Sequence, residues 1–312
     1  MPARAIVLDE HADDYVARLA PQFPDVRFHA ARTPADAEAS VADADIVIAL
    51  AHKLPPELLR KARALKWVQA LTTGTDALIG ILPSHVLLTS TRGVHGPQMS
   101  ELAFMHMLAL NRNFGRMRDS QTKGIWDRYP QPLLDGKTIV IVGVGILSEH
   151  LAQRCKLFGM RVMGVSSGRK DVANFERIYP RAALREAAAL ADFLVLLVPL
   201  SSETRHLINA DILAAMKPSA FLINLARGGV VDEAALIDYL QNGRIAGAGI
   251  DVFSTQPLPG DNPLWRMPNV VITPNVGGFS DRFVEQTLSI VAPNMQAFLD
   301  GRAGDLMNIV PH

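Results

Sequence analysis

The sequence predicts an α/β protein with two Rossmann-like domains, one flavodoxin-like and one dinucleotide-binding, each containing a parallel sheet. Three observations favour this class. Short apolar runs alternate with helical patterns almost throughout the chain. The length of 312 residues exceeds the ~250–300 residues at which a single core usually stops growing. A glycine-rich turn, GVGILS at 143–148, joins an apolar strand to a helical pattern.

The elements follow one another in a regular order. Five apolar runs predict the first strands: RAIVLD, DVRFHA, ADIVIAL, LKWVQAL and VLLTST. Helical patterns at 34–42 and 55–64 lie between them, and one long amphipathic helix is predicted from Gln98 to about Arg118. A proline-punctuated loop leads to six further strands, which form one doubly wound unit: 138–142, 161–165, 193–198, 220–224, 246–250 and 270–273. A helical pattern after Gly278 follows.

The composition excludes several classes of partner. Lys+Arg 31 balances Asp+Glu 31, which argues against binding nucleic acid or an anionic membrane surface. The single cysteine, Cys155, excludes an internal disulfide and fits a buried, inert thiol in a reducing compartment. The longest apolar run, ALADFLVLLVPL, is too short to cross a bilayer, and the N-terminus has no signal-peptide pattern. We therefore expect a soluble, cytoplasmic protein without a metal site.

The turn at 143–148 predicts a dinucleotide site. Gly143 permits a tight turn, and Gly145 lets the backbone amides that open the helix, at Ile146 and Leu147, approach a pyrophosphate. Ser148 stands at the third small position of the motif, which serves close packing of helix on strand. A merely structural turn is the alternative, but the second strand lies at the right distance for a cofactor fold.

The end of that second strand favours NADP(H) over NAD(H). Sites for NAD carry an acid there for the ribose hydroxyls, whereas this chain has no acid before Asp171. Two hydroxyls and two cations are available for a 2′-phosphate instead: Ser166, Ser167, Arg169 and Lys170. The alternative is a solvated charged turn beside a loosely bound NAD.

Several ordered blocks then resemble the D-isomer-specific 2-hydroxyacid dehydrogenase family, most closely its glyoxylate/hydroxypyruvate reductase branch. They include LKWVQALTTGTD, GKTIVIVGVG, MKPSAFLINLARGGVVDEAAL, GAGIDVF and PLPGDNPLWRMPNVVITP, and the resemblance covers roughly 65–310. It implies a substrate domain from 1–94 and 279–312, and an NADP-binding Rossmann domain at 95–278. It also implies a homodimer and a small 2-keto or 2-hydroxy acid bound between the domains.

The resemblance assigns roles to individual residues. Arg227 would hold the carboxylate and carbonyl of the acid, because a guanidinium grips a planar carboxylate with two parallel hydrogen bonds. Backbone amides around Thr73 and Gly74 would take the other carboxylate oxygen, and Asp251 would accept from the nicotinamide carboxamide. A structural ion pair for Arg227 and a helix cap for Asp251 are the alternatives. The remaining residues expected to line the cofactor are Val198, Pro199, Thr204, Leu225, Ala226, Asn275 and Gly277.

The chain departs from the family at the proton donor. The family places a His after TP, oriented by a Glu in DVFxxEP, and these positions are Asn275 and Gln256 here. A positioned general acid contributes ~10²–10⁴-fold to the rate. An amide at 275 can donate a hydrogen bond to the carbonyl oxygen but cannot deliver a proton. Possible substitutes are His52, Lys53, His95 and His106, for each of which a structural or solvated role is expected more strongly.

Three hypotheses follow. The first is an NADP(H)-dependent oxidoreductase of a small 2-keto or 2-hydroxy acid, with weakened or altered proton transfer. The second is hydride transfer on a substrate that needs no general acid, as in the similar formate dehydrogenases, which retain the histidine that this chain lacks. The third is a non-catalytic NADP(H)-binding homologue. In all three, Asn275 and Gln256 change together.

Overall fold

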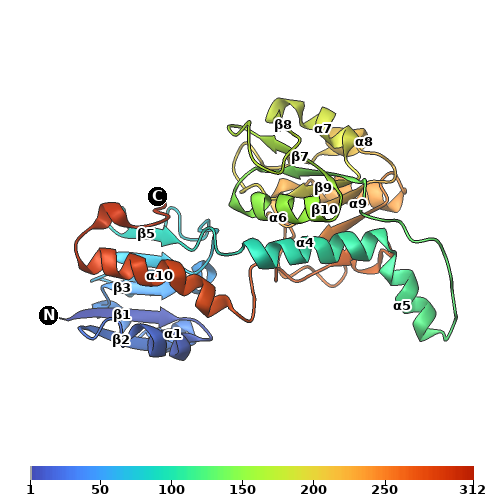
Figure 1. Cartoon of the computed structure of the whole chain (residues 1–312). Helices are drawn as coiled ribbons and strands as arrows, with labels where there is room; N and C mark the ends of the chain where they lie inside the picture. The colour runs from blue at the N-terminus through green and yellow to red at the C-terminus, as the bar shows by residue number, and fades with distance from the viewer. Residues whose placement is uncertain (1) are drawn as a thin grey trace. The chain divides into compact units, whose positions relative to one another are not determined.

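The computed structural model describes residues 2–312, and the chain folds as two α/β units, each with its own parallel sheet (Figure 1). Unit 1 comprises Met1–His95 together with Ser280–His312. Unit 2 comprises the continuous segment Gly96–Phe279. Each unit therefore has its own core, and unit 2 is an insertion in the sequence of unit 1.

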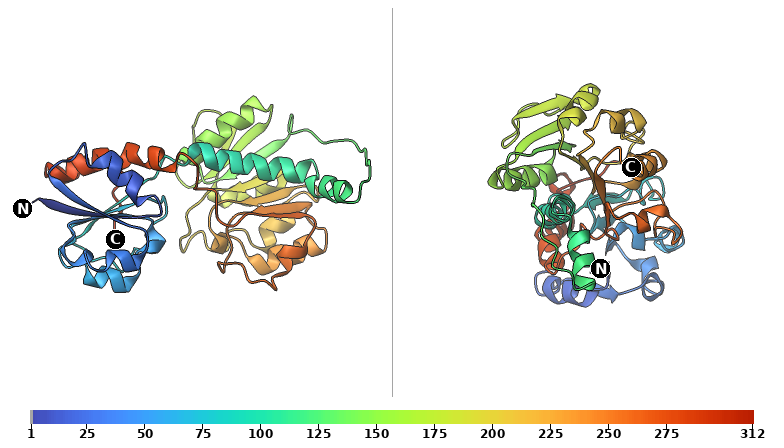
Figure 2. Two further views of the ribbon diagram at one scale, coloured as in Figure 1. Left: turned by 90° about the horizontal axis from the view of Figure 1, so that it is seen from below. Right: turned by 90° about the vertical axis from the view of Figure 1, so that its right-hand side faces the viewer.

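Unit 1 has the flavodoxin-like strand order β2-β1-β3-β4-β5, all parallel. Its strands are β1 (Ala3–Leu8), β2 (Val26–Ala31), β3 (Ile46–Ala49), β4 (Trp67–Ala70) and β5 (Leu87–Ser90). Its helices are α1 (Ala12–Leu19), α2 (Pro34–Ala37), α3 (Pro56–Lys61) and α10 (Phe283–Leu299). Helices α1 and α10 cover one face of the sheet and α2 and α3 the other (Figure 2). Because both faces are covered, strands such as β3 are apolar at every position.

Unit 2 has the strand order β12-β11-β10-β9-β6-β7-β8, all parallel, as in dinucleotide-binding Rossmann domains. Its strands are β6 (Thr138–Val142), β7 (Arg161–Ser166), β8 (Arg177–Pro180), β9 (Phe193–Leu196), β10 (Phe221–Asn224), β11 (Gly247–Ile250) and β12 (Val270–Ile272). Its helices are α4 (Gly96–Asn111), α5 (Phe114–Thr122), α6 (Ile146–Leu157), α7 (Leu184–Leu190), α8 (Ala210–Ala215) and α9 (Glu233–Gln241). Helices α4 and α6 pack on one face and α7, α8 and α9 on the other.

Two predictions about unit 2 were wrong. The helix expected as one segment from 98 to 118 is broken into α4 and α5 at Asn113, which has a φ of +51°. Asn tolerates this left-handed conformation, and its side chain accepts a hydrogen bond from the amide of Arg116, so it starts a new helix. Strand β8 was not predicted, because its four residues end in a proline and lie at the sheet edge.

The parallel strands bring distant segments of unit 2 together. The order of the sheet reverses between β6 and β9, which is the topological switch point where such folds bind ligands. The loops after β6, β7, β9, β10, β11 and β12 all leave the same edge of the sheet, which we call the carboxyl edge. Most of the predicted site residues lie in these loops.

Candidate cofactor and catalytic site

The turn after β6 has the geometry of a phosphate cradle. Gly143 has a φ of +99°, and a Cβ at this position would lie 2.8 Å from the carbonyl oxygen of Leu197, so only glycine fits. At Gly145 a Cβ would meet no atom within 4 Å, which leaves open space in front of helix α6. The first amides of a helix have no acceptor within it and attract anions. A pyrophosphate therefore fits this turn, and Gly143, Gly145, Ile146 and Leu147 would hold it.

Ser148 was predicted only to allow close packing of helix on strand, but its hydroxyl also forms two hydrogen bonds with Gly145. Its hydroxyl is buried, accepts from the amide of Gly145 at 2.6 Å and donates to the carbonyl of Gly145 at 2.7 Å. The side chain thus caps α6 from within its own first turn. In the sequence, a serine three residues after the second glycine of the motif could have indicated this cap.

The loop after β7 holds the four residues predicted to bind a 2′-phosphate. The hydroxyl of Ser166 accepts from the amides of Gly168 and Arg169, at 3.3 and 3.0 Å, and so fixes the loop. Ser167 and Lys170 are exposed. The guanidinium of Arg169 forms an ion pair with the carboxylate of Glu149, in the first turn of α6. The sequence reasoning missed Glu149, because nothing in the sequence pairs two residues twenty positions apart.

The loop after β9 is held by Thr204, which is buried. Its hydroxyl donates to the carbonyl of Pro199 at 2.7 Å and accepts from the amide of Ser201 at 2.7 Å. Val198 is half-buried beside the glycine turn that follows β6, and Pro199 is exposed. Thr204 therefore fixes this loop from its buried side.

The loop after β10 positions Arg227, which is half-buried and follows the buried Leu225 and Ala226. The buried amide of Asn224 accepts from the amide of Ala226 at 3.1 Å and donates to the carbonyl of Arg227 at 3.2 Å. A Cβ at Gly228 would lie 1.9 Å from the carbonyl carbon of Phe253, so only glycine allows the two backbones to approach so closely. Asn224 was another residue that the sequence reasoning did not single out. It acts through the backbone of the loop that carries Arg227.

Asp251, at the end of β11, is only 2% exposed and accepts three hydrogen bonds from the loop after β12. Its Oδ1 accepts from the hydroxyl of Thr273 at 2.6 Å and from the amide of Val276 at 3.0 Å. Its Oδ2 accepts from the amide of Gly277 at 3.1 Å. A Cβ at Gly277 would lie 3.0 Å from this Oδ2, so glycine allows the close approach. The carboxylate is therefore both satisfied and fixed in direction.

His106 of α4 extends this network into the core. Its Nε2 lies 3.1 Å from the hydroxyl oxygen of Thr273. Because that hydroxyl gives its single proton to Asp251, Nε2 must carry the hydrogen that it donates to Thr273. Burial lowers the pKa of His106 to about 4, so its ring is neutral near pH 7. Within residues 2–312 its Nδ1 has no hydrogen-bond partner and packs where a Cβ of Gly249 would be. These contacts give His106 a structural role in unit 2.

The two amides that replace the family's acid–base pair are in contact. The Nδ2 of Asn275 donates to Oε1 of Gln256 at 3.0 Å, and Nε2 of Gln256 donates to the carbonyl of Phe253 at 3.3 Å. The backbone of Asn275 is left-handed, with a φ of +55°, and its amide donates to the carbonyl of Asp251 at 2.8 Å. Both side chains are exposed. An amide Nδ2 has two hydrogens, so one N–H of Asn275 remains for a further acceptor.

The residues expected in unit 1 follow its strands at the carboxyl edge of its own sheet. The hydroxyl of Thr73 lies 2.9 Å from Nδ1 of His95, whose burial lowers its pKa to about 4. The hydroxyl of Thr72 donates to the carbonyl of Gly74 at 2.7 Å and shapes the same turn. After β3, Lys53 forms an ion pair with Glu10 at 3.3 Å. Burial, and then the charge of Lys53, lower the pKa of the neighbouring His52.

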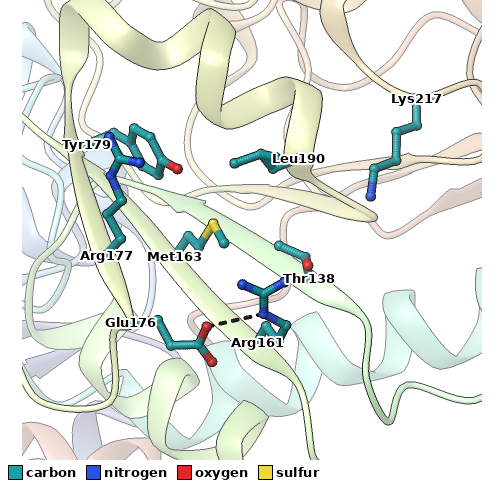
Figure 3. A pocket seen from close by; sticks show the side chains of 8 residues that line it. All are labelled: Thr138, Arg161, Met163, Glu176, Arg177, Tyr179, Leu190 and Lys217. Atoms are coloured by element: carbon teal, nitrogen blue, oxygen red, sulfur yellow. Dashed lines mark hydrogen bonds and ion pairs between the residues drawn. The ribbon is translucent and has the colours of Figure 1, made fainter.

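A cavity of about 480 Å³ lies at the opposite, amino edge of the unit 2 sheet (Figure 3). Its three cations are already paired: Arg161 with Glu176 at 3.2 Å, Arg177 with Glu186 at 3.5 Å and Lys217 with Asp192 at 3.0 Å. None of the predicted site residues lines it. Across the described residues 2–312, no cluster of three or more His, Cys, Asp or Glu could hold a metal, and no helix is long and apolar enough to span a membrane.

Comparisons with known proteins agree with this geometry. Residues 104–277 match the family described as D-isomer specific 2-hydroxyacid dehydrogenase, NAD binding domain. A glyoxylate reductase of Pyrococcus horikoshii is 35% identical over 267 residues, which cover 82% of this chain and 80% of that protein. A D-3-phosphoglycerate dehydrogenase of Methanocaldococcus jannaschii is 31% identical over 278 residues, or 87% of this chain, which spans only 53% of that longer protein.

Solved structures give the same result over both units. A D-isomer specific 2-hydroxyacid dehydrogenase family protein of Aeromonas salmonicida superposes with a TM-score of 0.93 at 34% identity, covering 99% of both chains. An NADPH-dependent glyoxylate/hydroxypyruvate reductase of Sinorhizobium meliloti, in complex with NADP and sulfate, superposes with a TM-score of 0.85 at 28% identity. That match covers 99% of this chain and 98% of the other.

Proposed function

Because the chain belongs to the D-isomer specific 2-hydroxyacid dehydrogenase family, we propose that it is an NADP(H)-dependent reductase of a small 2-keto acid such as glyoxylate or hydroxypyruvate. Members of this family bind a nicotinamide dinucleotide and transfer hydride between it and small 2-keto or 2-hydroxy acids. The choice of NADP(H), the substrate and a weakened proton transfer are the finer parts of the proposal. The observation that carries it is an ordered Arg227 loop and Asp251 network beside an open glycine turn.

The preference for NADP(H) is supported by the loop after β7. It offers two serine hydroxyls and two cations and has no acid before Asp171, a pattern that suits a 2′-phosphate. The similar reductase of Sinorhizobium meliloti was crystallised with NADP. The expected result is a smaller Kd for NADPH than for NADH, measured by quenching of protein fluorescence. Equal or tighter binding of NADH would remove this part of the proposal.

The proposed roles divide between the units. The proposed cofactor-binding domain keeps the expected bounds 95–278, which differ by one residue at each end from those of unit 2. Six further residues line its cofactor site: Val198, Pro199, Thr204, Leu225, Ala226 and Gly277. Residues 1–94 and 279–312 form the substrate domain, in which the turn at Thr73 and Gly74 takes one carboxylate oxygen. Arg227 grips the acid with two parallel hydrogen bonds, and Asp251 accepts from the nicotinamide carboxamide. The fixed direction of the Asp251 carboxylate suits this role, because it sets which face of the ring is offered.

Asn275 stands where the family has its proton donor, and we propose that this amide lowers the rate of the reaction. A reduced nicotinamide, when bound, would supply the hydride, and negative charge would then develop on the carbonyl oxygen of the acid. The free N–H of Asn275 stabilises that oxygen with a hydrogen bond, while Gln256 holds the amide in place. Neither amide can release a proton, so water or another residue must supply it. We therefore expect turnover ~10²–10⁴-fold below that of a site with a positioned general acid.

The test is a reductase assay at high enzyme concentration. NADPH is mixed with glyoxylate, hydroxypyruvate or phenylpyruvate, and loss of its absorbance is followed against blanks without protein. Slow but protein-dependent loss supports the proposal. No loss above the blank with any of the three acids refutes the reductase, although cofactor binding can still be measured separately.

A second function is favoured by the hydrogen-bonded amide pair itself. A non-catalytic NADP(H)-binding homologue would keep the cofactor site and lose the proton donor, as seen at Asn275 and Gln256. The double variant Gln256→Glu with Asn275→His separates the two functions. A large gain in reductase activity shows that the rest of the site is competent. No activity in either form, with unchanged cofactor affinity, favours the binding protein.

The homodimer expected from the family stays a proposal, as does the cytoplasmic location. Helix α5 and the loop after it project away from the sheet of unit 2 (Figure 1). Their apolar side chains are exposed: Phe114 by 53%, Ile125 by 57%, Trp126 by 91% and Leu133 by 61%. Exposed apolar patches of this kind mark contact surfaces. Light scattering after size exclusion should give twice the monomer mass, and the double variant Ile125→Ser with Trp126→Ser should lower it.

A further inference from the structure

The ion pair between Arg169 and Glu149 changes the charge that the cofactor meets. The loop after β7 carries two cations, but Arg169 shares its charge with an acid on α6. Lys170 has no ion pair within the described residues 2–312, so it is the cation that stays available. The loop itself is held by the hydroxyl of Ser166, which binds the amides of Gly168 and Arg169. The backbone of Arg169 is therefore fixed, while its guanidinium can pair either with the Glu149 carboxylate or with a 2′-phosphate.

The pair is weak enough to exchange. The side chains of Arg169 and Glu149 are 46% and 39% exposed, and ion pairs at such positions change an equilibrium constant by up to about fivefold. A phosphate monoester carries about −1.5 to −2 charges near neutral pH. It attracts the guanidinium more strongly than one carboxylate does, but Glu149 then remains close to the phosphate as a like charge.

Glu149 also supplies what the loop after β7 lacks. A site for NAD has a carboxylate that accepts hydrogen bonds from the ribose hydroxyls, usually at the end of the second strand. Here the end of β7 has only serines and cations, whereas Glu149 presents a carboxylate from the neighbouring helix α6. Resting on the NADP(H) site proposed above, we infer that Glu149 is a specificity-determining residue. It competes with the 2′-phosphate for Arg169 and keeps the site open to the unphosphorylated cofactor.

Two fragments test this inference without any turnover. Adenosine 2′,5′-bisphosphate and 5′-AMP differ only in the 2′-phosphate, and calorimetry gives an association constant for each. The ratio compared is the association constant of adenosine 2′,5′-bisphosphate divided by that of 5′-AMP. It is measured for the unsubstituted protein and for its Glu149→Gln variant. Glu149→Gln should raise the ratio about fivefold, because it releases Arg169 and removes a like charge. The matched control is Glu186→Gln, which removes an exposed acid of α7 paired at 3.5 Å with Arg177, the first residue of β8, and it should leave the ratio unchanged.

A double-mutant cycle shows whether the effect passes through Arg169. Arg169→Gln alone should lower the ratio, and adding Glu149→Gln to it should restore much less than the fivefold gain seen in the native background. An unchanged ratio in Glu149→Gln overturns the inference. A lower ratio also overturns it, because Glu149 would then hold Arg169 in place for the phosphate.

The fragment ratio of the unsubstituted protein tests the proposed preference for NADP(H) separately from the role of Glu149. A ratio at or below one in that protein contradicts the preference for NADP(H), whatever Glu149 does. A rise in Glu149→Gln from such a low starting ratio would still support the role of Glu149. If neither fragment binds any of the proteins, both the proposed site and this inference fail.

Discussion

The contact between His106, Thr273 and Asp251 can be tested by removing its central hydroxyl. Thr273→Val keeps the shape of the side chain but deletes the donor that lies 2.6 Å from Oδ1 of Asp251. A hydrogen bond to a charged group contributes about 1.5–3 kcal/mol, and a buried donor left unpaired costs about 1–3 kcal/mol. Thr273 is only half-buried, so the lower part of the combined range applies. We expect the free energy of unfolding of unit 2 to fall by about 3 kcal/mol.

The assay is thermal and urea unfolding, with Thr273→Ser as the matched control. For a domain of this size, 1 kcal/mol corresponds to roughly 2–4 °C in Tm, so the valine variant should lose about 6–12 °C. The serine variant keeps the hydroxyl and should lose about 1 kcal/mol for its missing methyl group. Nitrogen NMR of His106 should show hydrogen on Nε2 in the native protein. A decrease in the free energy of unfolding below about 1 kcal/mol in Thr273→Val, or equal decreases in both variants, would refute the hydrogen bonds from His106 through Thr273 to Asp251.

Further predictions concern pH, glycine and the helix cap. His95 and His106 have pKa values lowered to about 4 by burial, against about 6.5 when unfolded. The unfolded chain therefore binds more protons between these values, so stability should fall by about 1.4 kcal/mol per pH unit for each His as the pH drops from 6.5 to 4, with little change above 7; a flat profile in acid unfolding curves would contradict both burial shifts. Gly145→Ala should leave the Tm nearly unchanged, since its Cβ meets no protein atom, yet raise the Kd for NADPH about tenfold, about 1.4 kcal/mol, by occupying the space in front of α6; unchanged fluorescence titrations would argue against a pyrophosphate there. Gly228→Ala should instead destabilise unit 2 by about 3 kcal/mol or more, because its Cβ would overlap the backbone of Phe253, and a normal urea midpoint would count against this geometry. Ser148→Ala should cost about 1 kcal/mol as a lost cap, measured in the same urea unfolding series, where no change would show that the cap is unimportant.

The elements that the sequence predicted best are those whose pattern has a single interpretation. Strand β6 is buried at all five positions and apolar at the four after Thr138, because helices cover both faces of its sheet. The glycine turn that follows β6 is specific for the same reason, since Gly143 alone tolerates both the positive φ and the nearby Leu197 carbonyl.

The remaining features depend on side-chain contacts that the apolar pattern of the sequence does not encode. The break at Asn113 was missed because the apolar spacing continues across it, while one side chain in the left-handed region decides where the helix ends. Glu149 was missed because it reaches the loop of Arg169 only after folding. Asn224 was missed although its partners, Ala226 and Arg227, are close to it in the sequence, because the run of residues does not show how the turn bends its backbone toward the side chain. Gln256 and Asn275 could be paired from the family pattern, but the direction of their hydrogen bond came only from the structure.

The insertion of one unit into the other has a consequence for synthesis on the ribosome. The core under β3 and β4 includes Phe283, Val291 and Met295 of α10, which are made after the whole of unit 2. Until α10 is made, the N-terminal part of unit 1 therefore has only α1 on that face of its sheet. Unit 2 holds its own two ends together through the side chain of Gln98, which donates to the carbonyl of Gly278 at 3.3 Å. We expect unit 2 to reach its native state first and unit 1 to complete its fold only after α10 has been made.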